Sequence, residues 1–448
     1  MRADFRLAWL LTRGSDRREW WRVALTALGA SFATGIALVI ATVASMDGQA
    51  SVSFGSGLLN TASDRRSVIM ALVMLLAPVL GFLGQCARVG AVHRDRRLAT
   101  LRLAGATAAQ VRRISALEAG LACLIGSLLA TVPYVLVLLR VWRHPEPLAW
   151  PGITLVAVAV PALGAAVSAL SLRRVVASPL GWVRRIPPTR GPGRAFRTVT
   201  VLLLVMALGV SLTMYFGNPV EFALGPLTVL ALSLLTGVSA VWLAGWSARR
   251  IGGALAARAQ RPALLIAAER LRDDPWAAAR THAAVLLVTV VGTAFVGIRQ
   301  TLLYLVSDTD DLAANRAYYV TGLDLSGAAI GVALALTLSA LAVSTAEALA
   351  TRRRGLAAQA AAGIPQSVLG RALLLETALP LAPAVLLAGV GGTAIHIGWA
   401  AAVEDATGPV PLVPALVPVA VYAACLLAAA TSLPLLRRSV RPAELRYA

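Results

Sequence analysis

The chain has 448 residues, of which 58% are hydrophobic and only 14% are charged. A soluble domain typically carries about 25% charged residues, so this composition excludes an ordinary soluble protein and is typical of one with many membrane spans. The net charge of +20 comes from 41 arginines and no lysine, and the arginines cluster between apolar runs, which indicates membrane topology rather than nucleic-acid binding.

Ten apolar runs are long enough to cross a bilayer, for which a helix needs about 20 residues. Unpaired backbone groups are too costly in lipid, so each run is expected to be helical, and the predicted fold class is an all-α polytopic membrane protein. In chain order the ten predicted spans lie near residues 22–45, 67–88, 114–139, 152–172, 198–215, 225–246, 282–306, 324–348, 371–397 and 412–436.

The arginines also predict the orientation of these spans. If both termini are cytoplasmic, 35 of the 41 arginines lie in the inner segments, as the positive-inside rule requires. The outer segments are short, the longest being about 20 residues, so no folded extracellular domain is expected. The alanine- and arginine-rich, lysine-free composition favours a bacterial plasma membrane.

The sequence contains an internal repeat with a constant offset of 258 residues. Arg94, Arg96, Gly105 and Glu118 fall on Arg352, Arg354, Gly363 and Glu376. Such self-similarity indicates a duplicated structural unit. We therefore expect a first four-helix repeat with an N-terminal interfacial helix over 1–180, a two-helix linker over 181–258, and a second four-helix repeat over 259–448.

Each repeat contains a helix break before its third span. In the first copy, Leu98 and Leu101 share one helix face while the arginines around them face water, as in a helix that lies on a membrane surface. Gly105 is expected to close this helix in the left-handed conformation, and Thr107 with Gln110 has the spacing of a capping box that starts the next helix. In the second copy, Gly363 and the proline two residues later are expected to make the same break.

The sequence excludes a phosphate-binding P-loop and does not support a metal site. A phosphate-binding P-loop needs a lysine, and the chain has none, so we expect no ATPase activity and no cofactor bound by this chain. The four histidines are scattered and the three cysteines match no metal-binding spacing, so no metal site is predicted.

Charged residues inside a predicted span are costly and often functional, and Glu118, Arg299 and Glu376 are the candidates of this kind. Glu118 and Glu376 are expected either to pair with Arg113 and Arg371 on their own helices or to clamp the preceding surface helix. Arg299 either extends to the lipid headgroups or contacts a substrate.

The run Arg96-Arg97-Leu98-Ala99-Thr100-Leu101-Arg102-Leu103-Ala104-Gly105-Ala106-Thr107 and the C-terminal RPAELR resemble the FtsX-like permease family of ABC transporters. The 4+2+4 arrangement of spans is similar to the ten-span branch of bacitracin-resistance-type permeases, without their large extracellular domain. The acidic residue that usually follows the arginines is replaced by Arg97 in one copy and Gly355 in the other, which implies two unequal docking sites.

The resemblance implies that both breaks are coupling helices that dock on a separate ABC ATPase, two copies per permease, with ATP and Mg²⁺ bound by that partner. The implied coupling residues are Arg94, Arg96, Arg97, Arg102, Gly105, Thr107, Arg352, Arg353, Arg354 and Gly363. The implied function is export or extrusion of an amphipathic or hydrophobic compound such as an antibiotic, peptide or lipid. The alternatives are an ATPase-driven regulatory membrane protein that moves no cargo and, ranked last, a secondary transporter.

Overall fold

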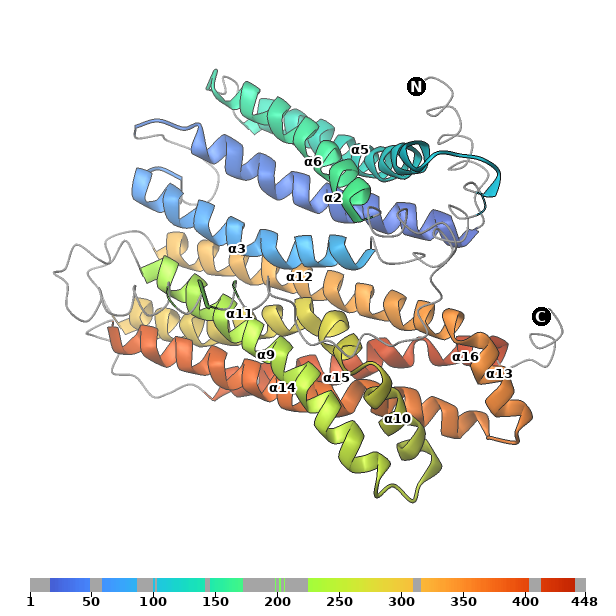
Figure 1. Cartoon of the computed structure of the whole chain (residues 1–448). Helices are drawn as coiled ribbons and strands as arrows, with labels where there is room; N and C mark the ends of the chain where they lie inside the picture. Colours follow the sequence, from blue (N-terminus) through green and yellow to red (C-terminus); the bar gives the residue numbers. More distant parts are fainter. Residues whose placement is uncertain are drawn as a thin grey trace. The chain divides into compact units, whose positions relative to one another are not determined.

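In the computed structural model, the described parts of the chain are residues 17–48, 59–86, 103–141, 146–171, 225–308, 316–402 and 412–439, together with residues 100, 198, 201, 202 and 205. Every regular element within these ranges is a helix (Figure 1), which confirms the predicted all-α class. Among the described residues of 1–184, the helices with described bounds are α2 (Arg17–Ala44), α3 (Ala62–Cys86), α5 (Ala108–Val141) and α6 (Ala149–Ser171).

The helices of residues 185–448 are more numerous. They are α9 (Gly225–Ala256), α10 (Pro262–Asp273), α11 (Pro275–Asp308), α12 (Arg316–Thr351), α13 (Arg353–Ala361), α14 (Gln366–Ala402), the short 3₁₀ turn η2 (Val413–Ala415), α15 (Leu416–Ala430) and α16 (Leu433–Ser439).

Eight of the described helices are long and apolar enough to span a membrane, and they coincide with eight of the ten predicted spans. The predicted span near 67–88 lies largely in α3. The predicted span near 198–215 lies mostly outside the described residues. The chain is therefore a multi-pass membrane protein.

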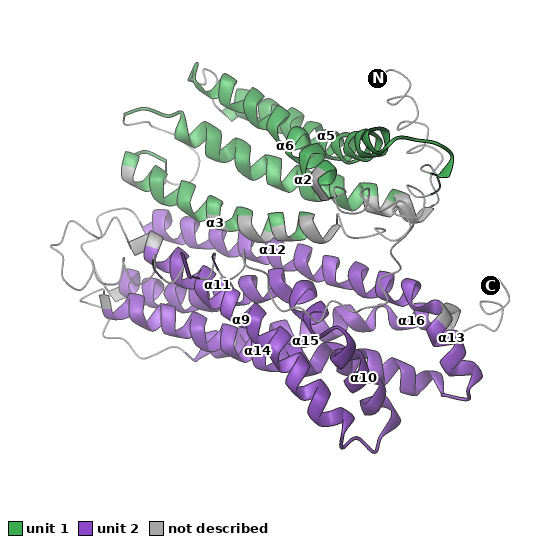
Figure 2. Cartoon of the chain, in the orientation of Figure 1, with its two compact units in different colours: residues 1–184 green, residues 185–448 purple. Residues whose placement is uncertain are grey.

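The first compact unit, residues 1–184, is organised around α2 (Figure 2). Helix α2 packs against α3, α5 and α6, and α5 also packs along α6. A Cβ added at Gly126 of α5 would lie only 2.1 Å from the carbonyl oxygen of Ala27 in α2, so glycine lets the two backbones approach closely. The Tyr134 hydroxyl then donates a hydrogen bond to Thr42 Oγ1 at 2.7 Å, which ties α5 to α2 within the apolar bundle.

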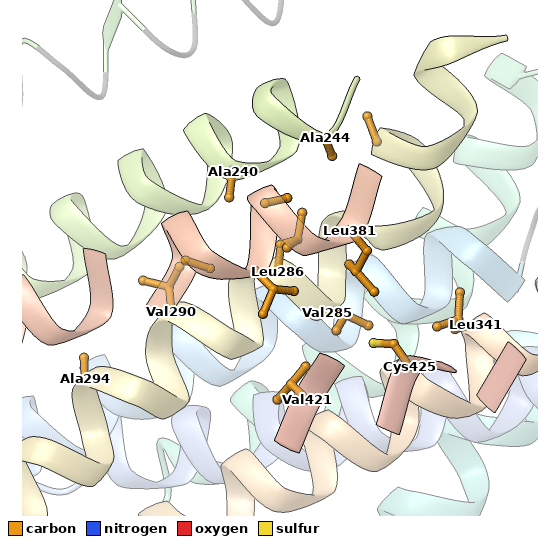
Figure 3. Packing of buried hydrophobic residues seen from close by; sticks show 14 of the residues in the cluster. Ala240, Ala244, Val285, Leu286, Val290, Ala294, Leu341, Leu381, Val421 and Cys425 are labelled. Carbon is orange, nitrogen blue, oxygen red and sulfur yellow. The ribbon is translucent and has the colours of Figure 1, made fainter. Parts of the chain in front are cut away.

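The second compact unit, residues 185–448, is organised around α11 and α14. Its core is formed by small and branched side chains from α9, α11, α12, α14 and α15, including Ala240, Leu286, Leu341, Leu381 and Val421 (Figure 3). Helix α9, which falls in the predicted two-helix linker, packs against both α11 and α14 in this unit.

Four helix pairings recur in the two units. In the register of the 258-residue repeat, α2, α3, α5 and α6 correspond to α11, α12, α14 and α15. Helix α2 packs against the other three of its set, as α11 does in the second set, and α5 packs on α6 as α14 packs on α15. The close approach also recurs, because a Cβ at Gly392 of α14 would lie 2.7 Å from the carbonyl oxygen of Val290 in α11.

Candidate functional site

Helix α13 is a nine-residue amphipathic segment between two long spans, α12 and α14. Its buried side carries Leu356, which packs in a cluster with Leu349 of α12, Leu369 and Leu373 of α14, and Leu436 of α16. The exposed positions among the described side chains of α13 are all small, a glycine at 355 and alanines at 358 and 361. The helix is therefore fixed by one face, and the described part of its other face carries small residues.

The end of α13 is closed by Gly363, whose φ is 89°. The Gly363 N–H donates to the carbonyl oxygen of Ala360 at 2.9 Å, and the Ile364 N–H donates to that of Gln359 at 3.1 Å. This pair of bonds is the Schellman ending, and Ile364 completes it by packing on the α13 leucine cluster. A β-carbon would be strained at this φ, so the corner requires glycine.

The corresponding corner of the first unit precedes α5. Gly105 is left-handed with φ 97°, as expected from its position. The Thr107 N–H donates to Gln110 Oε1 at 2.8 Å and the Gln110 N–H donates to Thr107 Oγ1 at 3.2 Å, which is the predicted capping box. Arg94, Arg96, Arg97 and Arg102 lie outside the described residues, as does the side chain of Arg354.

Glu376 of α14 forms the centre of a charged cluster beside α13. Its Oε1 and Oε2 accept hydrogen bonds from Arg352 Nη1 at 2.8 and 3.1 Å, and Oε2 lies 3.4 Å from Arg270 Nη1 of α10. Arg270 also donates from Nη2 to Gln359 Oε1 of α13 at 3.4 Å. We call Arg270, Arg352, Gln359 and Glu376 the α13 clamp, because they join α10, α13 and α14 through side chains alone.

Glu376 forms its ion pairs with arginines that lie outside its own helix. Among the described residues, the ion-pair partners of Glu376 are Arg352 and Arg270, and not Arg371 of its own helix. The equivalent Glu118 of α5 is buried. Three residues earlier on the same helix, the hydroxyl of Ser115 forms a hydrogen bond of 3.1 Å with the hydroxyl of Ser168 in α6.

Arg299 of α11 forms an ion pair with Asp324 of α12, with Arg299 Nη2 at 2.8 Å from Asp324 Oδ1. Beside this pair, α11, α12 and α15 enclose a cavity of about 420 Å³ with mainly apolar lining.

The α13 clamp and the Arg299–Asp324 pair are separated along α12. From Asp324 to Arg352 the helix rises about 42 Å, at 1.5 Å per residue. A bilayer including its headgroups is about 40–45 Å thick, so the two charged sites are far enough apart to lie at opposite interfaces of a membrane. These two charged sites therefore lie near opposite ends of α12.

Residues 67–180 match the family model described as FtsX-like permease C-terminal. The similarity to FtsX-like permeases therefore covers 114 of the 448 residues. The matched segment lies in the first unit and includes α5, α6, Gly105, Thr107 and Glu118. No curated protein and no solved structure matches the chain significantly.

The similarity bears on the general class of this protein. FtsX-like permeases are membrane components of ABC transporter-type systems, are generally not enzymes themselves, and typically work with an ATPase. The matched segment supports an ABC transporter-type permease membrane subunit, and the chain crosses the membrane several times.

Three residues of these sites were not found from the sequence. Arg270 and Gln359 belong to the α13 clamp, and Asp324 pairs with Arg299. A signal existed for Asp324, because it is an acidic residue at the start of a predicted span, where charge is costly. Arg270 and Gln359 carry no such signal, since polar residues are common in a surface helix.

Proposed function

We propose that this protein is the membrane subunit of an ABC transporter in which a separate ATPase drives export or extrusion of an amphipathic or hydrophobic compound. The ATPase docks on α13 and on the corresponding segment around residues 92–106, two copies per permease chain. Both docking segments and both termini lie on the cytoplasmic side, as the arginine distribution favours.

The observation that carries this proposal is the construction of α13. A helix of nine residues contributes little stability of its own, yet this one is bounded by a left-handed glycine and anchored by a buried leucine. Its exposed small side chains allow a partner surface to approach the backbone closely. A short, rigidly mounted helix whose described exposed residues are small is suited to receive a force from another protein.

The α13 clamp provides the route by which that force reaches the membrane. Glu376 lies in α14, a helix of 37 residues that packs against α9, α11 and α15. Movement of α13 therefore pulls on α14 through Arg352 and on α10 through Arg270. Because a long packed helix moves nearly as a rigid body, a displacement at the clamp is carried to the opposite interface.

The docking sites of the two repeats are expected to be unequal. Both copies have a left-handed glycine at the corner, but the first has Arg97 where the second has Gly355. The first segment also keeps Arg102, while the second is alanine-rich at the matching positions. We infer that the first site binds its ATPase more through charge and the second more through close contact.

A cysteine pair on α13 tests the docking site. Ala358 is exposed and Ala357 is buried beside it, so Ala358→Cys is expected to cross-link to a co-purified ATP-binding subunit and Ala357→Cys is not. The proposal also expects ATPase activity in the purified complex, at two ATPase copies per permease. Purification of an active permease with no ATPase, or equal cross-linking at both positions, would contradict it.

Transport distinguishes this function from a regulatory one. The complete complex in liposomes is expected to move an amphipathic cargo only when ATP is supplied. ATP hydrolysis in response to such compounds without any movement of cargo would instead favour a regulatory membrane protein.

A further inference from the structure

The cavity of the second unit runs from the Arg299–Asp324 pair toward the middle of the membrane. On α12 its lining includes Gly327 and Gly331, three and seven residues after Asp324, and on α11 it continues from Arg299 to Val288. Residues at these spacings share one helix face, so the two helix faces form one continuous groove. Its length along α11 is about 16 Å, which is half of a hydrocarbon core of about 30 Å.

Glycines leave this space open, because they carry no side chain. A Cβ added at Gly331 would meet no described heavy atom within 4 Å, and one at Gly292 would meet only Ile330 and Val417, at 3.6 Å or more. Among the described residues that line the cavity, Arg299 and Asp324 alone carry charge. The volume of about 420 Å³ is at the lower end of the range for ligand pockets, which suits a single alkyl chain.

The charged end of the cavity is open to a ligand. Arg299 and Asp324 form their pair through one oxygen, and their side chains remain 39% and 58% exposed. The remaining N–H groups of the guanidinium can bind a phosphate, while the second carboxylate oxygen can accept hydrogen bonds from an ammonium group. A cation and an anion held side by side therefore match a headgroup that carries one charge of each sign.

We propose that this cavity binds one acyl chain of a zwitterionic phospholipid, whose phosphate contacts Arg299 and whose ammonium contacts Asp324. The chain lies along Gly327 and Gly331 within a single leaflet. An anionic lipid with the same chains binds less well, because its headgroup offers the carboxylate no cation. This site requires neither the ATPase nor transport, so its failure would leave the proposed function unaffected.

Photo-cross-linking of the full-length permease tests the proposal. The probes are phosphatidylethanolamine and phosphatidylglycerol with identical acyl chains that carry a diazirine, each added to vesicles of a phosphatidylethanolamine–phosphatidylglycerol mixture. The ethanolamine probe is expected to label peptides that contain residues 288–296 and 327–334, about tenfold more strongly than the glycerol probe.

Two variants show whether the labelled site is the cavity. Gly331→Leu fills the groove, and it is expected to reduce this labelling at least tenfold without impairing folding, because the added side chain enters open space. Gly398→Leu is the matched control, since Gly398 is also an exposed helical glycine with no described atom within 4 Å of an added Cβ, but it lies outside the cavity lining. Its labelling is expected to equal that of the native protein.

Charge variants test the headgroup. Arg299→Gln and Asp324→Asn are each expected to remove most of the preference for the ethanolamine probe, while the chain still enters the cavity. Labelling of the cavity by both probes alike in the native protein would overturn the proposed headgroup. Absence of labelling there, which would result if another part of the chain covers the groove, or unchanged labelling in Gly331→Leu, would overturn the site itself.

Discussion

Replacing Glu376 by glutamine is expected to loosen α13 from α14 without unfolding the membrane bundle. The variant removes the carboxylate that Arg352 and Arg270 share, at 2.8 and 3.4 Å, and keeps the size of the side chain. The leucine cluster beneath α13 stays intact, so the effect is confined to the polar side of the helix.

The size of the stability loss in Glu376→Gln follows from the solvent exposure of Arg352 and Arg270. Arg352 is 41% exposed, so solvent screening limits its pair with Glu376 to about 0.5–1 kcal/mol. Arg270 is only 15% exposed, and leaving its guanidinium without the carboxylate costs about 1 kcal/mol more. The free energy of local opening of α13 should therefore fall by about 1.5–2 kcal/mol, which is roughly a 10–30-fold increase in the open population.

Hydrogen exchange measures this opening directly. Amides of residues 353–364 are expected to exchange about 10–30-fold faster in Glu376→Gln, while amides in the middle of α14 keep their protection. Arg371→Gln is the control, because Arg371 is an exposed arginine on the same helix outside the α13 clamp. Equal exchange of α13 in Glu376→Gln and in the native protein, or an equally large effect of Arg371→Gln, would refute the reasoning.

Two glycine substitutions, each with a matched control, give further tests by thermal unfolding in detergent. Gly363→Ala places a β-carbon at φ 89° and should destabilise the second unit by about 1 kcal/mol, whereas Gly355→Ala on the open face of α13 should stabilise slightly. Gly126→Ala forces α5 away from α2 and should cost about 1–3 kcal/mol, while Gly35→Ala, with no described atom within 4 Å, should not. Unchanged stability of Gly363→Ala, or equal unfolding temperatures for Gly126→Ala and Gly35→Ala, would contradict these expectations.

Helix positions and corners were predictable because their causes are local. An apolar run of about 20 residues must be helical in lipid wherever its neighbours lie. In the same way, Gly105 and Gly363 are left-handed because a glycine after an amphipathic run is the residue that such a corner tolerates, and Thr107 with Gln110 caps the next helix through contacts three residues apart.

Side-chain partners across helices were not predictable in this way. Glu376 was expected either to pair with Arg371, five residues away on its own helix, or to clamp the preceding surface helix. It pairs with Arg352 and with Arg270, which is 106 residues away. Which arginine reaches it depends on the rotation of α10 and α14 about their axes. Those rotations are set by packing against other helices. The spacing of apolar residues along one helix does not predict them.

The sequence by itself determined that this protein is a helical membrane protein, where eight of the ten predicted spans lie, and where the chain turns at Gly105 and Gly363. Only the tertiary structure decided which charges meet, as in the α13 clamp and the Arg299–Asp324 pair, and that a groove remains beside Gly331. The physical reason is range: hydrophobicity and backbone conformation act over a few residues, whereas ion pairs and cavities arise where separate helices pack together.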